Sequence, residues 1–215
     1  MSLPLPLPLS DAIHQRRSVK SFKPDAIPAE ILEQVITLTL AAPSSFNLQP
    51  WRIVVVDDPA QKEALAEVCW KQKQITQAPA VFVFAVDLKG WEKTLPATFD
   101  EARRLGAWPE KVIEFFGGAI PGFQHGLEAN GLIREYTIKD ALIAATHTAL
   151  AAESLGLGSC FMNGWTEDGV KKVIGAEGNP DIAIALVLPV GYPAEVPKFS
   201  GRLPASQTVF KNRLS

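Results

Sequence analysis

The sequence has few cysteines, no long apolar run and almost no net charge. Its two cysteines, Cys69 and Cys160, are far apart and form no CxxC pair, so we expect no disulfide framework and a reducing, cytoplasmic location. No apolar stretch is long enough to cross a bilayer, and the opening residues lack the pattern of a signal peptide. Lys and Arg total 21 against 23 for Asp and Glu, a net charge of −2, which leaves no basic excess for nucleic acid. We therefore expect neither a membrane nor a nucleic-acid partner.

Several well-known catalytic motifs are also missing. The chain has no P-loop motif and no GxSxG nucleophile elbow, and the run from Gly156 to Phe161 lacks the third glycine of a dinucleotide fingerprint. His14, His125 and His147 have no ligand spacing to one another or to a cysteine. No metal site is therefore predicted.

The apolar pattern predicts helices and strands in a single domain over residues 1–215. Helices are expected over 12–17, from Pro28 to just before Pro43, from Pro59 to about Lys73, along an alanine-rich stretch over 141–155, and after Thr166. Strands are expected at 53–56, 80–86, 159–162 and 182–190. The strand–helix–strand order over 53–86 suggests a βαβ unit, hence an α/β or α+β fold. Thr137 and Asp140 resemble a capping box for the alanine-rich helix, with Asp in place of Glu.

Three segments differ in texture from this core. Residues 1–9 begin with alternating Leu and Pro and predict a polyproline II arm. Residues from about 87 to 135 combine glycines and prolines with scattered aromatic side chains, which predicts short helices and loops, either as a lid or as a packing insertion. Residues 194–215 form an irregular polar tail that carries Val209 and Phe210, and we expect this tail to dock on another surface.

The most unusual loop is Pro43–Trp51, which contains Ser44, Ser45, Asn47 and Gln49 between two prolines. Pro43 and Pro50 disfavour helical backbone in the residues before them, so the loop is expected to be stiff and extended. Its hydroxyl and amide groups can donate and accept hydrogen bonds. Such a set suits the edge of a flat heterocycle, although an ordinary hydrogen-bonded turn uses the same residues.

A second unusual segment, Arg16–Phe22, places three cations within five residues around a serine. Together with the Pro43–Trp51 loop ahead of a strand, it resembles the N-terminal signatures of the FMN-dependent nitroreductase family. The later order is similar too: Gln72–Gln74 before Ala78–Pro79, the helix ending at Leu155–Gly158, the Asn163–Trp165 turn and Pro189–Pro193. The resemblance covers nearly the whole chain except the arm and the 87–135 excursion.

This resemblance implies an α+β fold with a central, mostly antiparallel sheet flanked by helices, the excursion forming a helical lid. It also implies a homodimer with FMN at the subunit interface, NAD(P)H as electron donor, and a tail (194–215) that docks on the partner subunit. Arg16 and Arg202 would face the FMN phosphate, Arg17 and Ser18 would lie beside phosphate or ribityl, and Lys20 would lie at the pyrimidine edge.

The other cofactor-binding positions follow from the same resemblance. The loop with Pro43, Ser44, Ser45, Asn47 and Gln49 would come from the partner chain. Lys71 and Gln74 would line the other side of the flavin. Phe161, Met162, Asn163 and Gly164 would lie over it, with the backbone of Asn163 and Gly164 near N5. No protein residue is assigned as a catalytic acid or base, because the redox chemistry belongs to the cofactor.

The implied activity is ping-pong hydride transfer through flavin N5 from NAD(P)H to a nitroaromatic, a quinone or a related small-molecule acceptor. Two alternatives remain: an FMN-binding sensor or carrier without turnover, and a relative of the reductive dehalogenases. The second has less support, because Leu132 stands four positions before Tyr136, where a glutamate would be expected.

Overall fold

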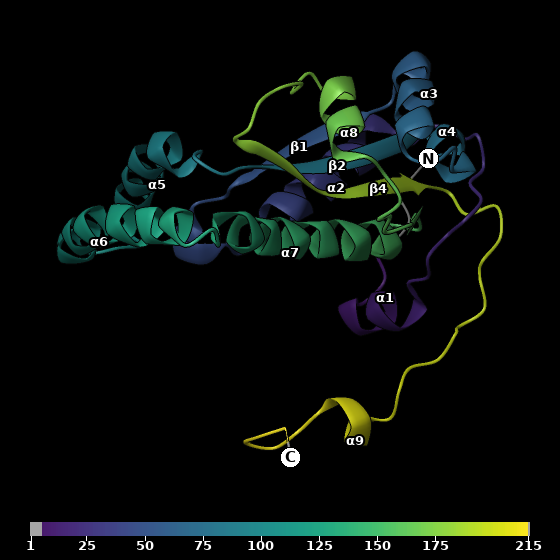
Figure 1. Ribbon diagram of the computed structural model, residues 1–215. Coiled ribbons are helices and arrows are strands. Elements are labelled where there is room, and N and C mark those ends of the chain that lie inside the picture. Colours follow the sequence, from purple (N-terminus) through teal and green to yellow (C-terminus); the bar gives the residue numbers. More distant parts are fainter. Residues whose placement is uncertain (1–5, 215) are drawn as a thin grey trace.

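A four-stranded sheet lies at the centre of the structure, a computed structural model that describes residues 6–214 (Figure 1). Its strands are β1 (Trp51–Val56), β2 (Ala80–Asp87), β3 (Gly158–Ser159) and β4 (Ile182–Gly191), in the order β1-β2-β4-β3. All three pairings are antiparallel, which confirms the predicted α+β sheet. The suggested βαβ unit is wrong, because β1 and β2 are antiparallel neighbours.

Helices cover both faces of this sheet. The alternation of side chains along β2 sends Phe82 and Phe84 to one core and Val81 and Val83 to the other. The first core lies under α2 (Ala29–Leu40) and α7 (Ile133–Ser154), and the second lies under α3 (Pro59–Val68), α4 (Lys73–Gln77) and α8 (Glu167–Val173). The apolar strand pattern predicted from the sequence therefore reflects a sheet that is buried on both sides.

Helix α7 is the longest helix of the described chain, and it packs on the sheet through small side chains such as Ala141, Ala144 and Ala145. It begins at Ile133, earlier than predicted, so the proposed capping box is wrong. Thr137 lies inside the helix and its hydroxyl donates to the carbonyl of Ile133 at 3.0 Å. Asp140 is buried and faces a loop instead of the helix start.

The excursion consists of two long helices, α5 (Trp91–Arg104) and α6 (Glu110–Ala129), where short helices and loops were predicted. Both extend beyond one end of the sheet (Figure 1). Their prolines and glycines are tolerated because aromatic packing outweighs weak local propensity. Phe99, Trp108 and Phe116 form a chain of edge-to-face contacts between the two helices.

The remaining boundaries differ modestly from the prediction. The helix expected to reach Lys73 ends at Val68, because Trp70 and Lys71 adopt left-handed backbone (φ 55° and 54°) before α4. Helix α1 (Leu9–Gln15) starts earlier than predicted, and of the proline-rich arm residues 1–5 lie outside the described chain. No helix within residues 6–214 combines the length and apolar character required to cross a bilayer.

The C-terminal tail leaves the sheet after Gly191, passes the end of α1, where Phe199 contacts Arg17, and ends away from the body (Figure 1). It contains one short helix, α9 (Ala205–Thr208). Its apolar side chains are exposed to solvent, with Val209 at 70% and Phe210 at 48% relative exposure. Docking of this tail on a partner stays a prediction.

Candidate functional site

Arginines from the two ends of the chain meet in one pocket of about 670 Å³. Arg16 and Arg17 follow helix α1 directly, and Arg202 comes from the tail. Both Arg17 and Arg202 lie over the ring of Phe199, whose centre is 4.8 Å from the guanidinium carbon of Arg17 and 5.3 Å from that of Arg202. Leu150 of α7 completes the wall. The pocket therefore concentrates positive charge over an apolar floor.

The arginines of this pocket differ in how their donors are used. One guanidinium nitrogen of Arg17 donates to the carbonyls of His14, Gln15 and Arg16 at 2.7, 2.9 and 3.0 Å, so it caps the end of α1. Burial raises the pKa of the nearby Glu153 carboxyl, while the positive charges of Arg16 and Arg17 act to lower it. The other donors of Arg17 and the guanidinium group of Arg16 can bind an anion.

The cationic segment continues along the edge of the sheet. Ser18 forms a β-bridge with Ser159, and the amide of Val19 donates to the carbonyl of Ser159 at 3.0 Å. Lys20 lies next along, and its ammonium nitrogen is 3.2 Å from the sulfur of Cys160. The predicted Ser18 and Lys20 are thus held beside the segment that runs to Phe161, Met162, Asn163 and Gly164.

The turn at 70–74 joins the same region, but through a residue that sequence reasoning missed. The side-chain amide nitrogen of Gln72 donates to the backbone carbonyl of Gly164 at 3.0 Å. Gln74 is buried, and its side-chain nitrogen donates to the side-chain oxygen of Gln72 at 3.1 Å, so it stabilises the turn. Lys71 is largely exposed and pairs with Glu67 at 3.4 Å. Of the two predicted residues, only Gln74 is tied to the 161–164 segment, and this connection runs through Gln72.

The Pro43–Trp51 loop has a strained backbone. Phe46, Asn47 and Gln49 all have left-handed φ values, 51°, 56° and 47°, in positions without glycine. The hydroxyl of Ser44 accepts the amide of Gln49 at 3.0 Å, and the side chain of Gln49 donates to Asn47. Such conformations persist only when surrounding contacts fix them. The loop is therefore fixed by its contacts, but the predicted extended backbone is wrong, because Ser45–Asn47 form a short 3₁₀ turn.

A second missed residue, Asp140, holds this loop from helix α7. The residue is 2% exposed, and its carboxylate accepts the amide of Ser45 at 3.0 Å and the Ser45 hydroxyl at 3.3 Å. Lys139 donates to the same hydroxyl at 3.3 Å and stacks over Tyr136 at 4.1 Å. Burial raises the pKa of Tyr136, a hydrogen bond with Ser45 lowers it, and the Asp140 charge raises it further.

The helices of the excursion hold the loop on its other side. Thr94 and Thr98 of α5 donate to the carbonyls of Leu48 and Asn47 at 3.2 and 3.4 Å. The ring of Phe46 meets Phe116 and Phe123 of α6, each at 5.6 Å between ring centres. The loop is thus clamped between α5, α6 and α7.

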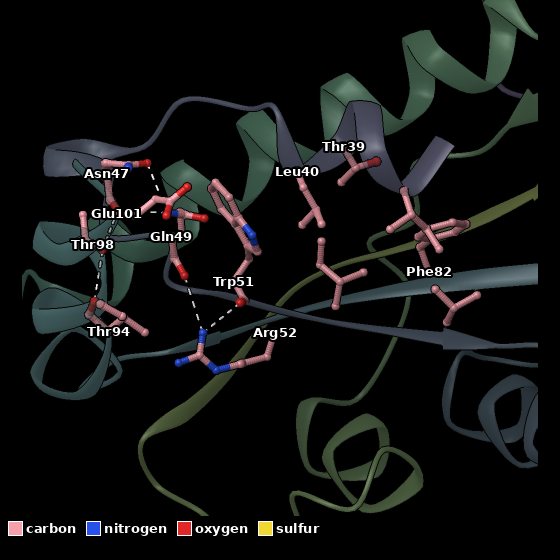
Figure 2. A pocket seen from close by; sticks show the side chains of 14 residues that line it. Thr39, Leu40, Asn47, Gln49, Trp51, Arg52, Phe82, Thr94, Thr98 and Glu101 are labelled. Carbon is pink, nitrogen blue, oxygen red and sulfur yellow. Dashed lines mark hydrogen bonds between the residues drawn. The ribbon is translucent and has the colours of Figure 1, made fainter. Parts of the chain in front are cut away.

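A pocket of about 600 Å³ opens beside this loop, between α2, β1 and α5. Figure 2 shows Asn47, Gln49, Thr94 and Thr98 at one end, with Leu40 and Phe82 at the other. Arg52 spans the floor and donates to the carbonyls of Gln49 and Trp51. The apolar part of the pocket follows β1, a strand at the edge of the sheet.

The predicted residues thus form two groups within one chain. The cationic pocket includes Thr146 and Leu150 of α7, whereas the loop contacts Asp140 on the same helix. At 1.5 Å per residue, Leu150 lies about 15 Å along the helix from Asp140. An open groove of about 500 Å³, lined by Lys139, Leu142 and Thr146 among others, runs between the two positions.

Comparison with known proteins identifies the class of this chain. The model of the nitroreductase family matches residues 13–192, so the chain belongs to that family. An NADH dehydrogenase of Thermus thermophilus is 36% identical over 208 residues, covering 94% of this chain and 97% of the relative. The family and fold expected from the sequence are confirmed.

Solved structures give the same result. A protein of Staphylococcus epidermidis, provisionally assigned as an NAD(P)H:FMN oxidoreductase, is 25% identical with a TM-score of 0.89, covering 98% of this chain and 99% of that chain. A provisionally assigned nitroreductase of Exiguobacterium sibiricum, solved in complex with FMN, has a TM-score of 0.88 at 23% identity and covers 98% and 100% of the two chains. The second likeness shows the fold alone.

Proposed function

We propose that this chain is an FMN-dependent NAD(P)H oxidoreductase that reduces nitroaromatics, quinones or related small molecules. The observation that carries the proposal is the cationic pocket, where Arg16, Arg17 and Arg202 converge from distant parts of the sequence. Membership of the nitroreductase family supports the same activity.

The residues present fit FMN by their chemistry. A phosphate dianion suits the guanidinium groups of Arg16 and Arg202, which offer planar pairs of donors. Lys20, on the same segment, would place a positive charge at the pyrimidine edge, where negative charge develops on reduction. The hydroxyl of Ser44 already accepts the amide of Gln49, so its proton stays available for a carbonyl of a flat heterocycle.

When bound, FMN would supply the two-electron transfer between NAD(P)H and the acceptor. The residues of this chain would bind, orient and shield the cofactor. The side chain of Gln72 fixes the backbone at Gly164, where an added Cβ would lie 2.6 Å from the Gln72 side-chain nitrogen, so the glycine allows this close packing within the chain. The aromatic rings of Phe46 and Phe123 would line the approach of a planar acceptor.

We further propose that two chains form each site. The loop and the cationic pocket lie at different positions along α7, and Leu142 in the groove between them is 37% exposed. The tail would pack on the partner, because its exposed Val209 and Phe210 need an apolar surface. The pocket beside the edge strand β1 offers one, lined by Leu40, Ile53 and other apolar side chains.

The function is tested by an absorption spectrum of the purified protein, followed by anaerobic addition of NADH and then NADPH. We expect flavin bands that bleach with a pyridine nucleotide and return with an acceptor. A double variant, Arg16→Ala with Arg202→Ala, should lose most bound FMN, whereas Lys111→Ala on α6 should retain it. Flavin bands that never bleach would favour a binding protein without turnover, and a protein that takes up no FMN would refute the proposal.

The shared site is tested by mixing two inactive variants. One carries the arginine substitutions, and the other carries Ser44→Ala with Asn47→Ala. If each site takes its arginines from one chain and its loop from the other, refolding an equal mixture restores about a quarter of the sites in a closed dimer. A mixture that stays inactive would show that each chain holds a complete site.

A further inference from the structure

The carboxylate of the buried Asp140 accepts two hydrogen bonds from one residue of the Pro43–Trp51 loop, and the ammonium nitrogen of Lys139 lies 3.7 Å from one of its oxygens. Asp140 is 2% exposed, and its two carboxylate oxygens accept the amide and the hydroxyl of Ser45, 95 residues away in sequence. Burying a carboxylate is expensive unless its oxygens are satisfied. The aspartate and the loop therefore stabilise each other's positions.

Because both donors of Ser45 are directed at Asp140, neither is left for the flavin in this arrangement. The hydroxyl oxygen of Ser45 also accepts a hydrogen bond from the ammonium group of Lys139 at 3.3 Å, which fixes the orientation of the hydroxyl. Ser44, the preceding residue, keeps a free hydroxyl proton because its oxygen accepts the amide of Gln49. The two adjacent serines thus have different roles, although the sequence presents them as equivalent.

We propose that Asp140 is a positioning residue for FMN binding, and that it acts through Ser45. This inference rests on the proposed function. By fixing Ser45, Asp140 sets where the strained turn at Phe46 and Asn47 begins, and thereby where Ser44 and Asn47 face the cofactor. Ser45 is then an anchor of the loop and not a ligand of the flavin.

The test measures the FMN dissociation constant of reconstituted apoprotein by fluorescence titration. Asp140→Ala removes both acceptors and should weaken FMN binding about tenfold or more. A charge-assisted hydrogen bond contributes a factor of about 10 to 100 in an equilibrium constant. Asp140→Asn keeps one acceptor and the side-chain volume, so we expect a smaller loss of about threefold. Thr148→Val is the matched control, because it removes a buried hydrogen bond of the same helix, with Thr39 at 2.7 Å, away from the loop.

A double-mutant cycle separates anchoring from direct contact. Ser45→Ala should weaken FMN binding in the wild-type background but add little to Asp140→Ala, because both changes break one connection. If Ser45 contacts the flavin itself, its loss will be as large in the Asp140→Ala background as in the wild type, and the proposal is overturned. Asp140→Asn takes the place of Asp140→Ala in the cycle if the alanine variant does not fold.

Two further results would also overturn the proposal. One is a folded Asp140→Ala protein that binds FMN within twofold of the wild type. The other is a Thr148→Val control that loses as much affinity, which would show a general effect of weakening α7. Failure of the wild-type protein to bind FMN at all would refute the proposed function instead, so the two failures are distinguishable.

Discussion

Adding one methyl group at Gly158 tests whether packing behind the cationic segment controls cofactor binding. A Cβ at this position would lie 2.5 Å from a methyl carbon of Val19 and 2.9 Å from the ring of Pro193. Carbon atoms normally rest about 3.5–4.0 Å apart, so Val19 or Pro193 has to move by roughly 1 Å. Overpacking of this kind costs about 1–3 kcal/mol of unfolding free energy.

The displacement has a second effect because Val19 stands between Ser18 and Lys20. We expect a movement of Val19 to weaken the hydrogen bond from its amide to Ser159 and to shift Lys20 away from Cys160. We expect Gly158→Ala to lower the unfolding free energy by about 1–3 kcal/mol in urea. We also expect it to raise the FMN dissociation constant about tenfold, the equivalent of one charge-assisted hydrogen bond.

Gly118→Ala is the control, because Gly118 lies in α6 and an added Cβ meets nothing within 4 Å. This change should leave FMN binding unaltered and stabilise the helix by up to about 1 kcal/mol. A Gly158→Ala protein with wild-type stability and affinity would refute the reasoning. A loss of stability without a loss of affinity would show that Pro193 moves and that Lys20 is independent of it.

Three further outcomes follow from burial and charge. Burial raises the pKa of Glu167, but hydrogen bonds from Arg134 and the Ile184 amide outweigh this effect and hold the pKa below 4.5. Glu167→Gln should therefore lower the unfolding free energy at neutral pH, and the loss should shrink below pH 4.5. A loss that does not change with pH would contradict this. Burial raises the pKa of Cys69 to about 12, so a thiolate reagent at pH 8 should label it only after denaturation, as peptide mapping would show. Phe84→Ala should cost about 3–5 kcal/mol in urea unfolding, and Phe115→Ala, at 68% exposure, far less.

Much of the fold could be predicted because its strands and helices follow simple periodicities. The strands at 80–86 and 182–190 correspond closely to β2 and β4, since a sheet buried on both faces requires continuous apolar runs. The excursion could not be predicted as two long helices. Its glycines and prolines disfavour helix locally, and only the contacts of Phe99, Trp108 and Phe116 across α5 and α6 compensate.

The candidate site was predictable in its motifs and not in its supports. Arg16, Arg17 and Arg202 were assigned to one group, and the structure brings them into one pocket. Asp140 was interpreted as a helix cap because it follows a threonine at the right spacing. A signal was present, however: Asp140 lies at helical spacing with the buried Ala144 and Thr148, where a lone acid needs a buried partner. That its partner is Ser45 depends on tertiary structure.

The clamping of the Pro43–Trp51 loop by α5, α6 and α7 has a consequence for changing this protein by selection. The excursion would ordinarily be the place to vary when a broader range of acceptors is wanted. Here Thr94, Thr98 and Phe116 contact the backbone or side chains of the loop itself. Libraries built on these helices should therefore yield many variants that are colourless, and screening for retained yellow colour before activity would recover the useful minority.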